Sequence, residues 1–334
     1  MNFSRLRDRK VLITGGLGFI GSNLAERLVW LGSDVTLLDS MIPEYGGNLH
    51  NVEGFRHRLR INIADVRDEH ALRYLVQGQD VLFNLAGQTS HLDSMEHPRS
   101  DLEINAAAQL SILEACRRYN PLVKLVFAST RQIYGRPERL PVDERHPIRP
   151  VDVNGINKMA GEMYHLLYHQ VYGIRTVALR LTNTYGPRMR VKDARQTFLG
   201  IWIRRLIDGL PILIYGDGHQ IRDFNYVDDV VDALLMAATE DRADGCVFNL
   251  GSSECVTLKD TAELLIELYG KGSYTLVPFP DDRKSIDIGD YHGDFTHIRS
   301  QLRWSPRVSL REGLHRTVTF YAQHSMHYWQ HDAA

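Results

Sequence analysis

The first half of the chain alternates short apolar segments with amphipathic stretches of helical periodicity. The apolar segments predict strands at 11–14, 35–39, 60–63, 80–85, 124–128 and 175–181. Nearly continuous apolar strands separated by helices indicate a parallel sheet that is covered on both faces. We therefore expect an α/β fold with a doubly wound, Rossmann-like parallel sheet, whose ligands bind at the carboxyl ends of the strands.

The pattern loosens after Gly186, where glycine and proline become frequent. Helices are predicted at 230–239, 258–269 and 310–321, and a polar segment at 279–294 precedes the last of them. We expect residues 1–185 to form the first domain, with 225–250 contributing to it. Residues 186–334 then form mainly a smaller C-terminal lobe that closes over the first domain.

Composition and charge exclude several classes of protein. The 334 residues are 43% hydrophobic and 24% charged, as in a soluble globular protein. A net charge of −2 provides no basic field for a phosphate backbone, so no nucleic-acid partner is expected. No apolar run suits a membrane span or a signal peptide, so we expect a cytoplasmic protein with no membrane partner.

Cysteine and histidine usage points to no metal centre. The three cysteines show no C-x-x-C spacing and are typical of reduced thiols: Cys116, Cys246 and Cys255. The tail contains His324, His327 and His331, and such a short tract is more typical of a solvated tail than of a metal site. We therefore expect no bound metal.

The strongest local signal is the G-x-x-G-x-x-G pattern of Gly15, Gly18 and Gly21, which follows the first strand and opens a helix. Glycine permits a tight turn and lets the backbone approach a pyrophosphate closely. The helix N-terminus adds N–H groups and the positive end of its dipole. Phe19 and Ile20 lie within the same turn, which is predicted to hold a dinucleotide.

Asp39 ends the second strand, 18 residues beyond Gly21. A carboxylate at this place accepts hydrogen bonds from the adenosine ribose and would repel the additional phosphate of NADP. Ser40 follows it, and no arginine is at hand to neutralise that phosphate. The pattern predicts NAD as the cofactor, with Asp39 and Ser40 among its contacts.

Taken together, the motifs of the chain resemble those of the extended short-chain dehydrogenase/reductase family, which contains nucleotide-sugar epimerases, dehydratases and decarboxylases. The resemblance runs almost from end to end of the chain. The matching segments are the glycine turn, Asp65-Val66, Leu85 to Gln88, Ser129 to Gly135, Arg180 to Arg188 and Gly216 to Phe224. The resemblance implies further cofactor contacts from Asp65, Val66, Leu85, Ala86, Gly87, Ser129 and Lys158, with Asn105 steadying the active-site strand.

The resemblance also implies a nucleoside-diphosphate sugar as the substrate, bound by the C-terminal lobe. By position, Asn183 would hydrogen-bond the diphosphate. Arg222 and Arg283 would pair with its charge, because a planar guanidinium can bind phosphate oxygens bidentately. Arg131 and Gln132 would contact the substrate as well. A homodimer is implied too, through helices at 102–119 and 156–172.

The sequence departs from this family at the catalytic helix. Family members carry Tyr-x-x-x-Lys, in which the tyrosine takes the proton of a sugar hydroxyl and the lysine lowers the tyrosine pKa. Lys158 is in place, but Asn154 stands at the tyrosine position. An amide cannot accept and return a proton at neutral pH. Thr130 keeps the hydroxyl that shares the proton of the reacting oxygen.

A replacement base is therefore needed if the chain catalyses this chemistry. His91 belongs to a loop that faces the substrate in the family, and histidine is suited to proton transfer near neutral pH. Tyr134 and Tyr185 are alternative bases. A packing role in the loop is the alternative for His91.

The two residues after Thr130 narrow the reaction. The 4,6-dehydratases place Asp and Glu there, and the decarboxylases usually have an acid at the second position. Arg131 and Gln132 cannot act as acid and base, which favours an NAD-dependent 4-epimerase that oxidises the sugar transiently. An atypical dehydratase or decarboxylase stays open, as does an NAD- and nucleotide-sugar-binding protein with little redox activity.

Overall fold

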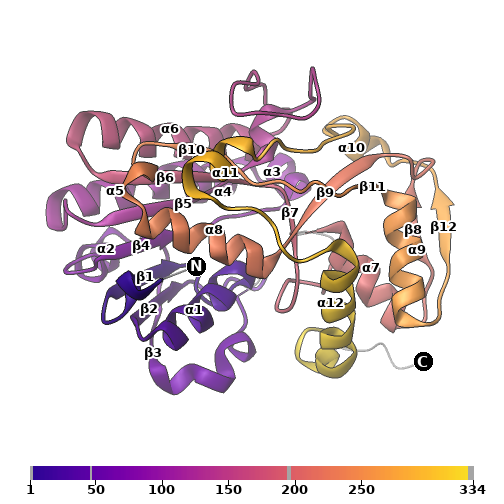
Figure 1. Ribbon diagram of the computed structural model, residues 1–334, viewed down its shortest axis with the longest axis horizontal. Coiled ribbons are helices and arrows are strands. Elements are labelled where there is room, and N and C mark those ends of the chain that lie inside the picture. Colours follow the sequence, from indigo (N-terminus) through magenta and orange to yellow (C-terminus); the bar gives the residue numbers. More distant parts are fainter. Residues whose placement is uncertain (1–2, 46, 194–196, 330–334) are drawn as a thin grey trace.

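The computed structural model describes residues 3–45, 47–193 and 197–329. A seven-stranded sheet, parallel throughout, forms the larger part of the molecule (Figure 1). Its strands, in spatial order, are β10 (Val247–Asn249), β6 (Arg175–Leu181), β5 (Lys124–Thr130), β4 (Val81–Asn84), β1 (Lys10–Thr14), β2 (Asp34–Asp39) and β3 (Leu59–Ile63). The expected doubly wound α/β fold is confirmed, and the strand order reverses between β1 and β4.

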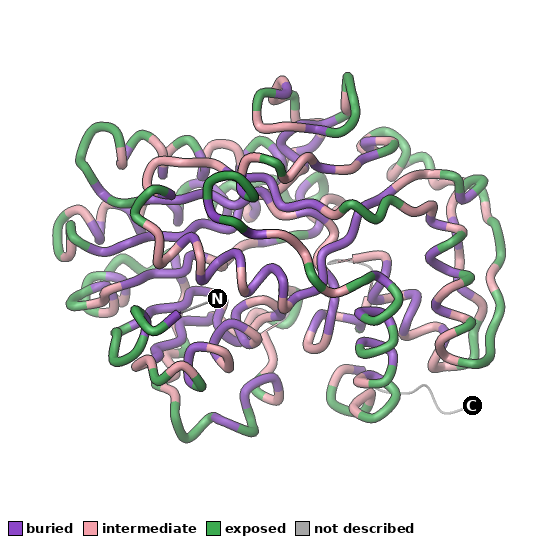
Figure 2. Tube along the Cα trace, in the orientation of Figure 1, coloured by how far each residue is buried: buried purple, intermediate pink, exposed green. Residues whose placement is uncertain are grey.

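Side chains of the central strands alternate between two buried layers, as a sheet covered on both faces requires. Val11 and Ile13 of β1 pack into one core, and Leu12 packs into the other. The first layer contains α1 (Phe19–Leu31) and α8 (Val227–Thr239). The second contains α2 (Glu69–Leu75), α5 (Ala108–Tyr119) and α6 (Val153–Tyr172). Figure 2 shows the strands as buried and the outer helix surfaces as exposed.

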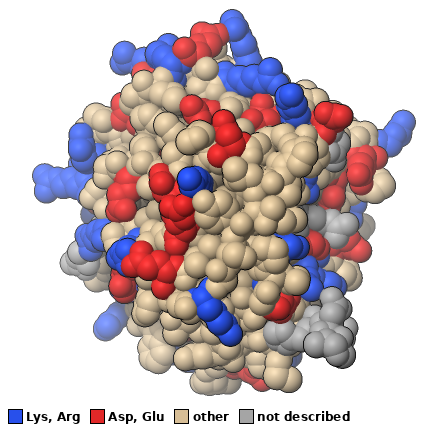
Figure 3. Space-filling view, turned by 90° about the vertical axis from the view of Figure 1, so that its right-hand side faces the viewer, with Lys and Arg blue, Asp and Glu red and all other residues tan. Residues whose placement is uncertain are grey.

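The second lobe is built on two small sheets. One joins β7 (Asn183–Tyr185), β9 (Ile221–Tyr226) and β11 (Cys255–Thr257), and the other pairs β8 (Ile212–Tyr215) with β12 (Tyr274–Val277). The helices here are α7 (Phe198–Ile207), α9 (Leu258–Tyr269), α10 (Asp281–Lys284) and α12 (Leu310–His324), and α11 (Thr296–Leu302) packs near β10. On the face that this lobe presents in Figure 3, basic and acidic residues are interspersed.

Helix α8 begins three residues before its predicted range, α12 ends three residues after its own, and two further helices differ from their predicted bounds. The helix expected at 102–119 is divided into α4 (Pro98–Leu102), a π-turn (Glu103–Ala107) and α5. The π-turn carries Asn105, whose amide donates to Asp101 and to the backbone of Gln88. The helix expected at 156–172 begins earlier, because the Asp152 carboxylate accepts the Gly155 N–H at 2.6 Å and caps α6.

Short 3₁₀ segments connect the larger elements. They are η1 (Ser4–Leu6), η2 (Leu49–Arg58), η4 (Arg131–Tyr134), η5 (Asp241–Ala243) and η6 (Ser325–His327). The short α-helix α3 (His91–Glu96) follows β4 after a short loop, and η4 follows β5 directly. They therefore place their first residues at the carboxyl edge of the sheet, where the switch point lies.

Candidate active site

A cavity of about 830 Å³ lies at the carboxyl ends of the strands and extends to residues of the second lobe. Its lining at the sheet edge includes nearly every predicted cofactor contact: Gly15, Gly18, Phe19, Ile20, Gly21, Asp39, Ser40, Asp65, Val66, Leu85, Ala86, Gly87, Ser129 and Lys158. It also includes Thr130, Asn154 and His91, together with the predicted substrate residues Arg131, Gln132, Asn183, Arg222 and Arg283. One cavity therefore joins both groups of residues.

The glycine turn has the geometry of a dinucleotide cradle. Gly15 has φ +67°, and a Cβ on it would lie 3.0 Å from the backbone nitrogen of Ala86. A Cβ on Gly21 would lie 2.2 Å from the Gly15 carbonyl oxygen, a contact that backbone atoms cannot relieve. Only glycine lets the turn, α1 and the β4 loop approach this closely. The N-terminus of α1 therefore faces the cavity unobstructed.

Asp39 is held in place at the end of β2. Its Oδ2 accepts the Leu17 N–H at 3.0 Å, and its Oδ1 accepts the Met41 N–H at 2.9 Å. Burial raises the Asp39 pKa above its usual range, although both hydrogen bonds act to lower it. The carboxylate is thus fixed beside the glycine turn, where an adenosine ribose would lie. The residues present fit NAD.

Lys158 lies at the other end of the cofactor half of the cavity. Its Nζ donates to the Ala128 carbonyl at 2.7 Å and lies 4.7 Å from the centre of the Phe127 ring. Burial lowers the Lys158 pKa to about 8, against the opposing charges of Asp101 and Glu162. Beside it, the buried Ser129 hydroxyl donates to Glu162 at 2.5 Å, so Ser129 anchors the end of β5 to α6.

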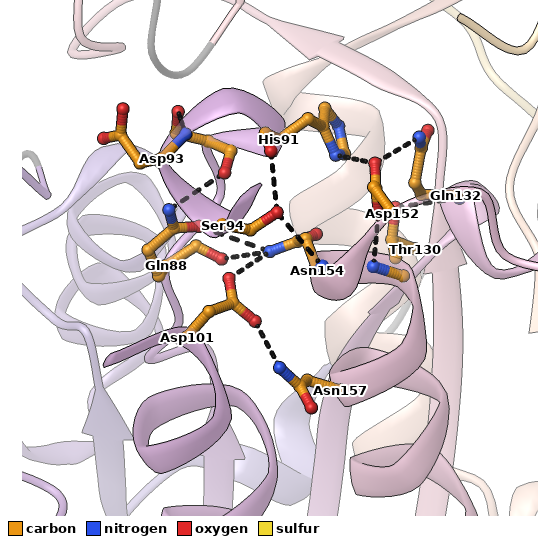
Figure 4. Close-up of polar contacts among 12 residues, drawn as sticks. Gln88, His91, Asp93, Ser94, Asp101, Thr130, Gln132, Asp152, Asn154 and Asn157 are labelled. Atoms are coloured by element: carbon orange, nitrogen blue, oxygen red, sulfur yellow. Dashed lines mark hydrogen bonds and ion pairs between the residues drawn. The ribbon is translucent and has the colours of Figure 1, made fainter. Parts of the chain in front are cut away.

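Asn154 is buried in a network of amides and carboxylates (Figure 4). Its Nδ2 lies 2.9 Å from the Gln88 carbonyl, 3.3 Å from Gln88 Oε1 and 3.1 Å from Asp101 Oδ2. Asp101 is itself buried and also accepts from Asn105 and Asn157. The amide N–H bonds of Asn154 are therefore fully used. Asn154 lines the cavity, and its Oδ1 is the side-chain atom left to accept a hydrogen bond from a ligand.

A histidine–carboxylate pair lies beside Asn154. His91 Nδ1 approaches Asp152 Oδ2 to 2.9 Å, and the Asp152 side chain is inaccessible to solvent while His91 is 41% exposed. The Gln132 amide donates to the same oxygen at 2.8 Å. Burial raises the Asp152 pKa, but His91, Gly155 and Gln132 outweigh it and hold this pKa below its usual value. Figure 4 shows the carboxylate between His91 and Gln132.

The contact has the distance of an ion pair but not the alignment of a hydrogen bond, because His91 Nδ1 makes no hydrogen bond with any described residue. It places a candidate general base beside a carboxylate that could orient it. A carboxylate at Nδ1 favours the tautomer with the proton on Nδ1 and leaves Nε2 as the acceptor. It also stabilises the imidazolium that forms when Nε2 takes a proton. Asp152 was not predicted as a site residue from the sequence. The one sign of such a role was a carboxylate two residues before the tyrosine position, and an ordinary helix N-cap has the same appearance.

The two tyrosine candidates lie outside the cavity, so the structure corrects both predictions. The Tyr134 phenol donates to Asn249 at 2.7 Å and accepts from Arg180 at 2.6 Å, and burial raises its pKa to about 12. Tyr185 is buried with its hydroxyl 3.4 Å from the Leu310 carbonyl. Asn105, which was expected to steady the active-site strand, does not line the cavity. It instead anchors the loop after β4.

The predicted substrate residues come from both lobes. Arg222 donates from Nη1 to the carbonyls of Ile221 and Gly289, and its Nη2 lies 3.6 Å from Asp287. Burial lowers its pKa to about 10. Asn183 accepts from Arg131 at 3.0 Å and donates to the Asp223 carbonyl. The Arg283 guanidinium lies 5.2 Å from the centre of the Tyr215 ring.

Metal-ligating side chains are not grouped together in the described part of the chain. No group of three or more histidine, cysteine, aspartate or glutamate side chains there could hold a metal ion. His324 and His327 instead lie against His50, and the His50 and His327 rings stack at 3.7 Å. His331 lies outside the described residues. No helix within the described ranges is long and apolar enough to span a membrane.

The sheet, its switch point and the glycine cradle define a dinucleotide-binding protein of the Rossmann class. The model of the NAD dependent epimerase/dehydratase family matches residues 11–251. The chain therefore belongs to this family, and NAD is its cofactor. This confirms the resemblance to the extended short-chain dehydrogenases/reductases.

Individual relatives carry out different reactions. A putative UDP-glucose 4-epimerase of Methanocaldococcus jannaschii is 32% identical over 313 residues, which cover 93% of this chain and 97% of the relative. A dTDP-glucose 4,6-dehydratase of an Actinoplanes species is 30% identical over 322 residues, with the same coverage. The structure of a UDP-glucose 4-epimerase from Thermotoga maritima with UDP-glucose has a TM-score of 0.87 at 30% identity, covering 95% and 99% of the two chains. The chain thus belongs to a family of NAD-dependent enzymes that modify nucleotide sugars.

Proposed function

We propose that this protein is a nucleotide-sugar 4-epimerase in which the His91–Asp152 pair replaces the missing tyrosine as the general base. The observation that carries this proposal is the 2.9 Å contact between His91 Nδ1 and the buried Asp152 carboxylate, in a cavity that also contains Thr130 and Lys158. The fold and the cofactor alone support only the broader class of enzyme.

The proposed proton path uses residues of this chain. NAD, when bound, supplies the acceptor for the hydride of the sugar C–H bond. His91 Nε2 takes the proton of the hydroxyl on that carbon, and Asp152 stabilises the imidazolium. The Thr130 hydroxyl donates to the oxygen of the same hydroxyl, and the Asn154 amide oxygen accepts from a neighbouring hydroxyl of the sugar. Lys158 would bind the nicotinamide ribose in place of its present acceptor, the Ala128 carbonyl.

Gln132 supports epimerisation over elimination of water. Its amide is buried and donates to Asp152 at 2.8 Å, and an amide does not ionise at neutral pH. Arg131 likewise stays charged. Neither side chain can provide the acid and base that removal of a hydroxyl at C6 would require. The transient 4-keto sugar is then reduced again at C4.

Asn154 favours a second candidate, a protein that binds NAD and a nucleotide sugar with little redox activity. Its Nδ2 group is saturated by Gln88 and Asp101, so this position contributes no proton transfer. In that case the cavity keeps its binding residues but has lost its base, and His91 only packs against Asp152.

Deuterium at C4 of the sugar separates these functions. The enzyme would be mixed with four C4-deuterated substrates: UDP-glucose, dTDP-glucose, UDP-glucuronate and dTDP-glucuronate. The products would be followed by NMR. The proposal predicts the C4 epimer with deuterium still at C4. Deuterium moved to C6 would make the protein a dehydratase, and release of carbon dioxide a decarboxylase. No conversion and no absorbance of reduced cofactor near 340 nm would favour the binding protein.

We further propose a homodimer formed through α5 and α6. Helix α6 presents a row of apolar side chains to solvent: Ile156, Met163, Leu167 and Val171, which are 42–59% exposed. Leu110 of the neighbouring α5 is 36% exposed. Apolar residues at helical spacing on an outer surface are typical of a protein–protein contact, and an isologous interface would bury them against their copies.

A further inference from the structure

A buried serine joins the segment that carries His91 to the helix that Asp152 caps. Ser94 belongs to α3, is inaccessible to solvent and does not line the cavity. Its Oγ donates to the His91 carbonyl at 2.7 Å and accepts the Asn154 N–H at 3.2 Å (Figure 4). The one proton and an acceptor site of the hydroxyl are therefore used. Ser94 binds the backbone of the proposed base on one side and the start of α6 on the other.

The start of α6 needs partners from outside its own backbone. The first four N–H groups of a helix have no acceptor within the helix. In α6 the Asp152 carboxylate accepts the Gly155 N–H, and Ser94 accepts the Asn154 N–H. One acceptor thus comes from the N-cap of the helix, and the other comes from α3, 60 residues earlier in the chain. This second acceptor ties α3 to α6 next to the place where His91 meets Asp152.

The contact between His91 and Asp152 depends closely on where α3 lies. His91 Nδ1 is inaccessible to solvent and makes no aligned hydrogen bond with any described residue, while Asp152 Oδ2 lies 2.9 Å away. Gln88 holds the first end of α3, because its amide donates to the Ser90 carbonyl at 2.9 Å. Ser94 holds the helix one turn further on. With both ends tied, the backbone of His91 cannot turn relative to the carboxylate.

We propose that Ser94 is a positioning residue, which aligns His91 with Asp152 by coupling α3 to α6; this inference rests on the proposed function. Without the hydroxyl, the His91 carbonyl and the Asn154 N–H lose their shared partner inside a buried junction, which is unfavourable for both groups. Helix α3 then turns about its Ser90 end until these groups reach water, and Nδ1 moves away from the carboxylate.

The tautomer of the neutral His91 ring tests this proposal without requiring turnover. A carboxylate beside Nδ1 favours the proton on Nδ1, whereas an imidazole free in water favours it on Nε2. NMR of the NAD-loaded protein with nitrogen-15 histidine distinguishes the two forms at about pH 8, where histidine is ordinarily neutral. His91→Asn identifies the signals. We expect the Nδ1 form to predominate in wild type, and its ratio to the Nε2 form to fall by about tenfold in Ser94→Ala.

Two variants accompany this measurement. Ser90→Ala is the matched control, because the Ser90 hydroxyl accepts the Asp93 N–H at 3.1 Å and so caps α3 from within its own segment. It should keep the wild-type tautomer ratio. Ser94→Cys replaces the hydroxyl by a weak donor of similar size and should lose part of the Nδ1 preference, even if Ser94→Ala folds poorly. A wild type without an excess of the Nδ1 form would overturn the proposal, as would Ser94→Ala and Ser94→Cys proteins with the wild-type ratio.

Turnover connects this position to the reaction. Ser94→Ala should lower kcat on the order of 10–10²-fold with little change in KM, as expected for a displaced catalytic group. In the His91→Asn background it should lower kcat no further, because Ser94 acts through His91. Equal losses in both backgrounds would make the role of Ser94 structural only and overturn the proposal. A wild type that converts no substrate contradicts the proposed function but leaves the tautomer result intact, so the two proposals fail separately.

Discussion

At the scale of single residues, Asn154 changes the chemistry of its position. The expected phenol would stand in the cavity and exchange a proton, whereas the amide is tied to Gln88 and Asp101. These contacts also join α6 to the loop after β4 and to α4. Asn154 therefore combines an architectural contact on its nitrogen side with a single acceptor, Oδ1, that is left for a ligand.

Substitution of Asn154 should affect turnover far less than loss of the base. Asn154→Ala removes an acceptor for a hydroxyl next to the reacting one, so we expect kcat to fall by about tenfold or less. Asn154→Tyr should also lower kcat, because a phenol crowds the sugar and leaves Asp101 and Gln88 with one partner fewer. Steady-state kinetics with the converted substrate checks both.

Asn157→Ala serves as the control, since Asn157 donates to the same Asp101 carboxylate at 2.8 Å but does not line the cavity. It should leave KM unchanged, whereas Asn154→Ala should raise KM. If Asn154→Tyr instead created or greatly increased epimerase activity, the protein would be a binder that has lost its base, with Lys158 and Thr130 still in place.

At the scale of elements, the sequence predicted those parts of the fold that local pattern specifies. Apolar runs identified the strands of the large sheet up to β6, and the glycine turn between β1 and α1 was evident from spacing alone. The short strand β10 (Val247–Asn249) has too few residues to show a period, although the first domain was expected to include it. The π-turn at Asn105 depends on contacts to Gln88 and Asp101, which no local pattern records.

The site residues that could be predicted are likewise those whose positions follow from local sequence. The cofactor contacts follow strand ends, so sequence order places them at one edge of the sheet. The His91–Asp152 pair forms between α3 and the start of α6, and the contact depends on how these two segments meet after folding. Tyr134 carried a strong motif but points into the polar core between Asn249 and Arg180. The motif placed Tyr134 just after the end of β5 but did not specify the direction in which its side chain points.

At the scale of the whole molecule, the exposed apolar row on α6 distinguishes one surface from the rest. Leu167→Arg should place two arginines near each other in the proposed symmetric interface and raise the dimer dissociation constant on the order of 10²-fold. Sedimentation velocity over a concentration series measures this. Leu210→Arg is the matched control, because Leu210 and Leu167 are both 48% exposed and Leu210 lies away from α5 and α6. A monomeric wild type, or a Leu167→Arg protein that dimerises as well as wild type, would refute the interface.

The replacement of the tyrosine by His91 and Asp152 is tested most directly by turnover of the two single variants and the double variant. His91→Asn should lower kcat by about 10²–10⁴-fold, the usual contribution of a general base. Asp152→Asn should cost less, and the double variant should be no slower than His91→Asn, because Asp152 acts through His91. His97→Asn, at an exposed histidine that ends α3, should match wild type. A His91→Asn enzyme that turns over at the wild-type rate would contradict the assignment of the base.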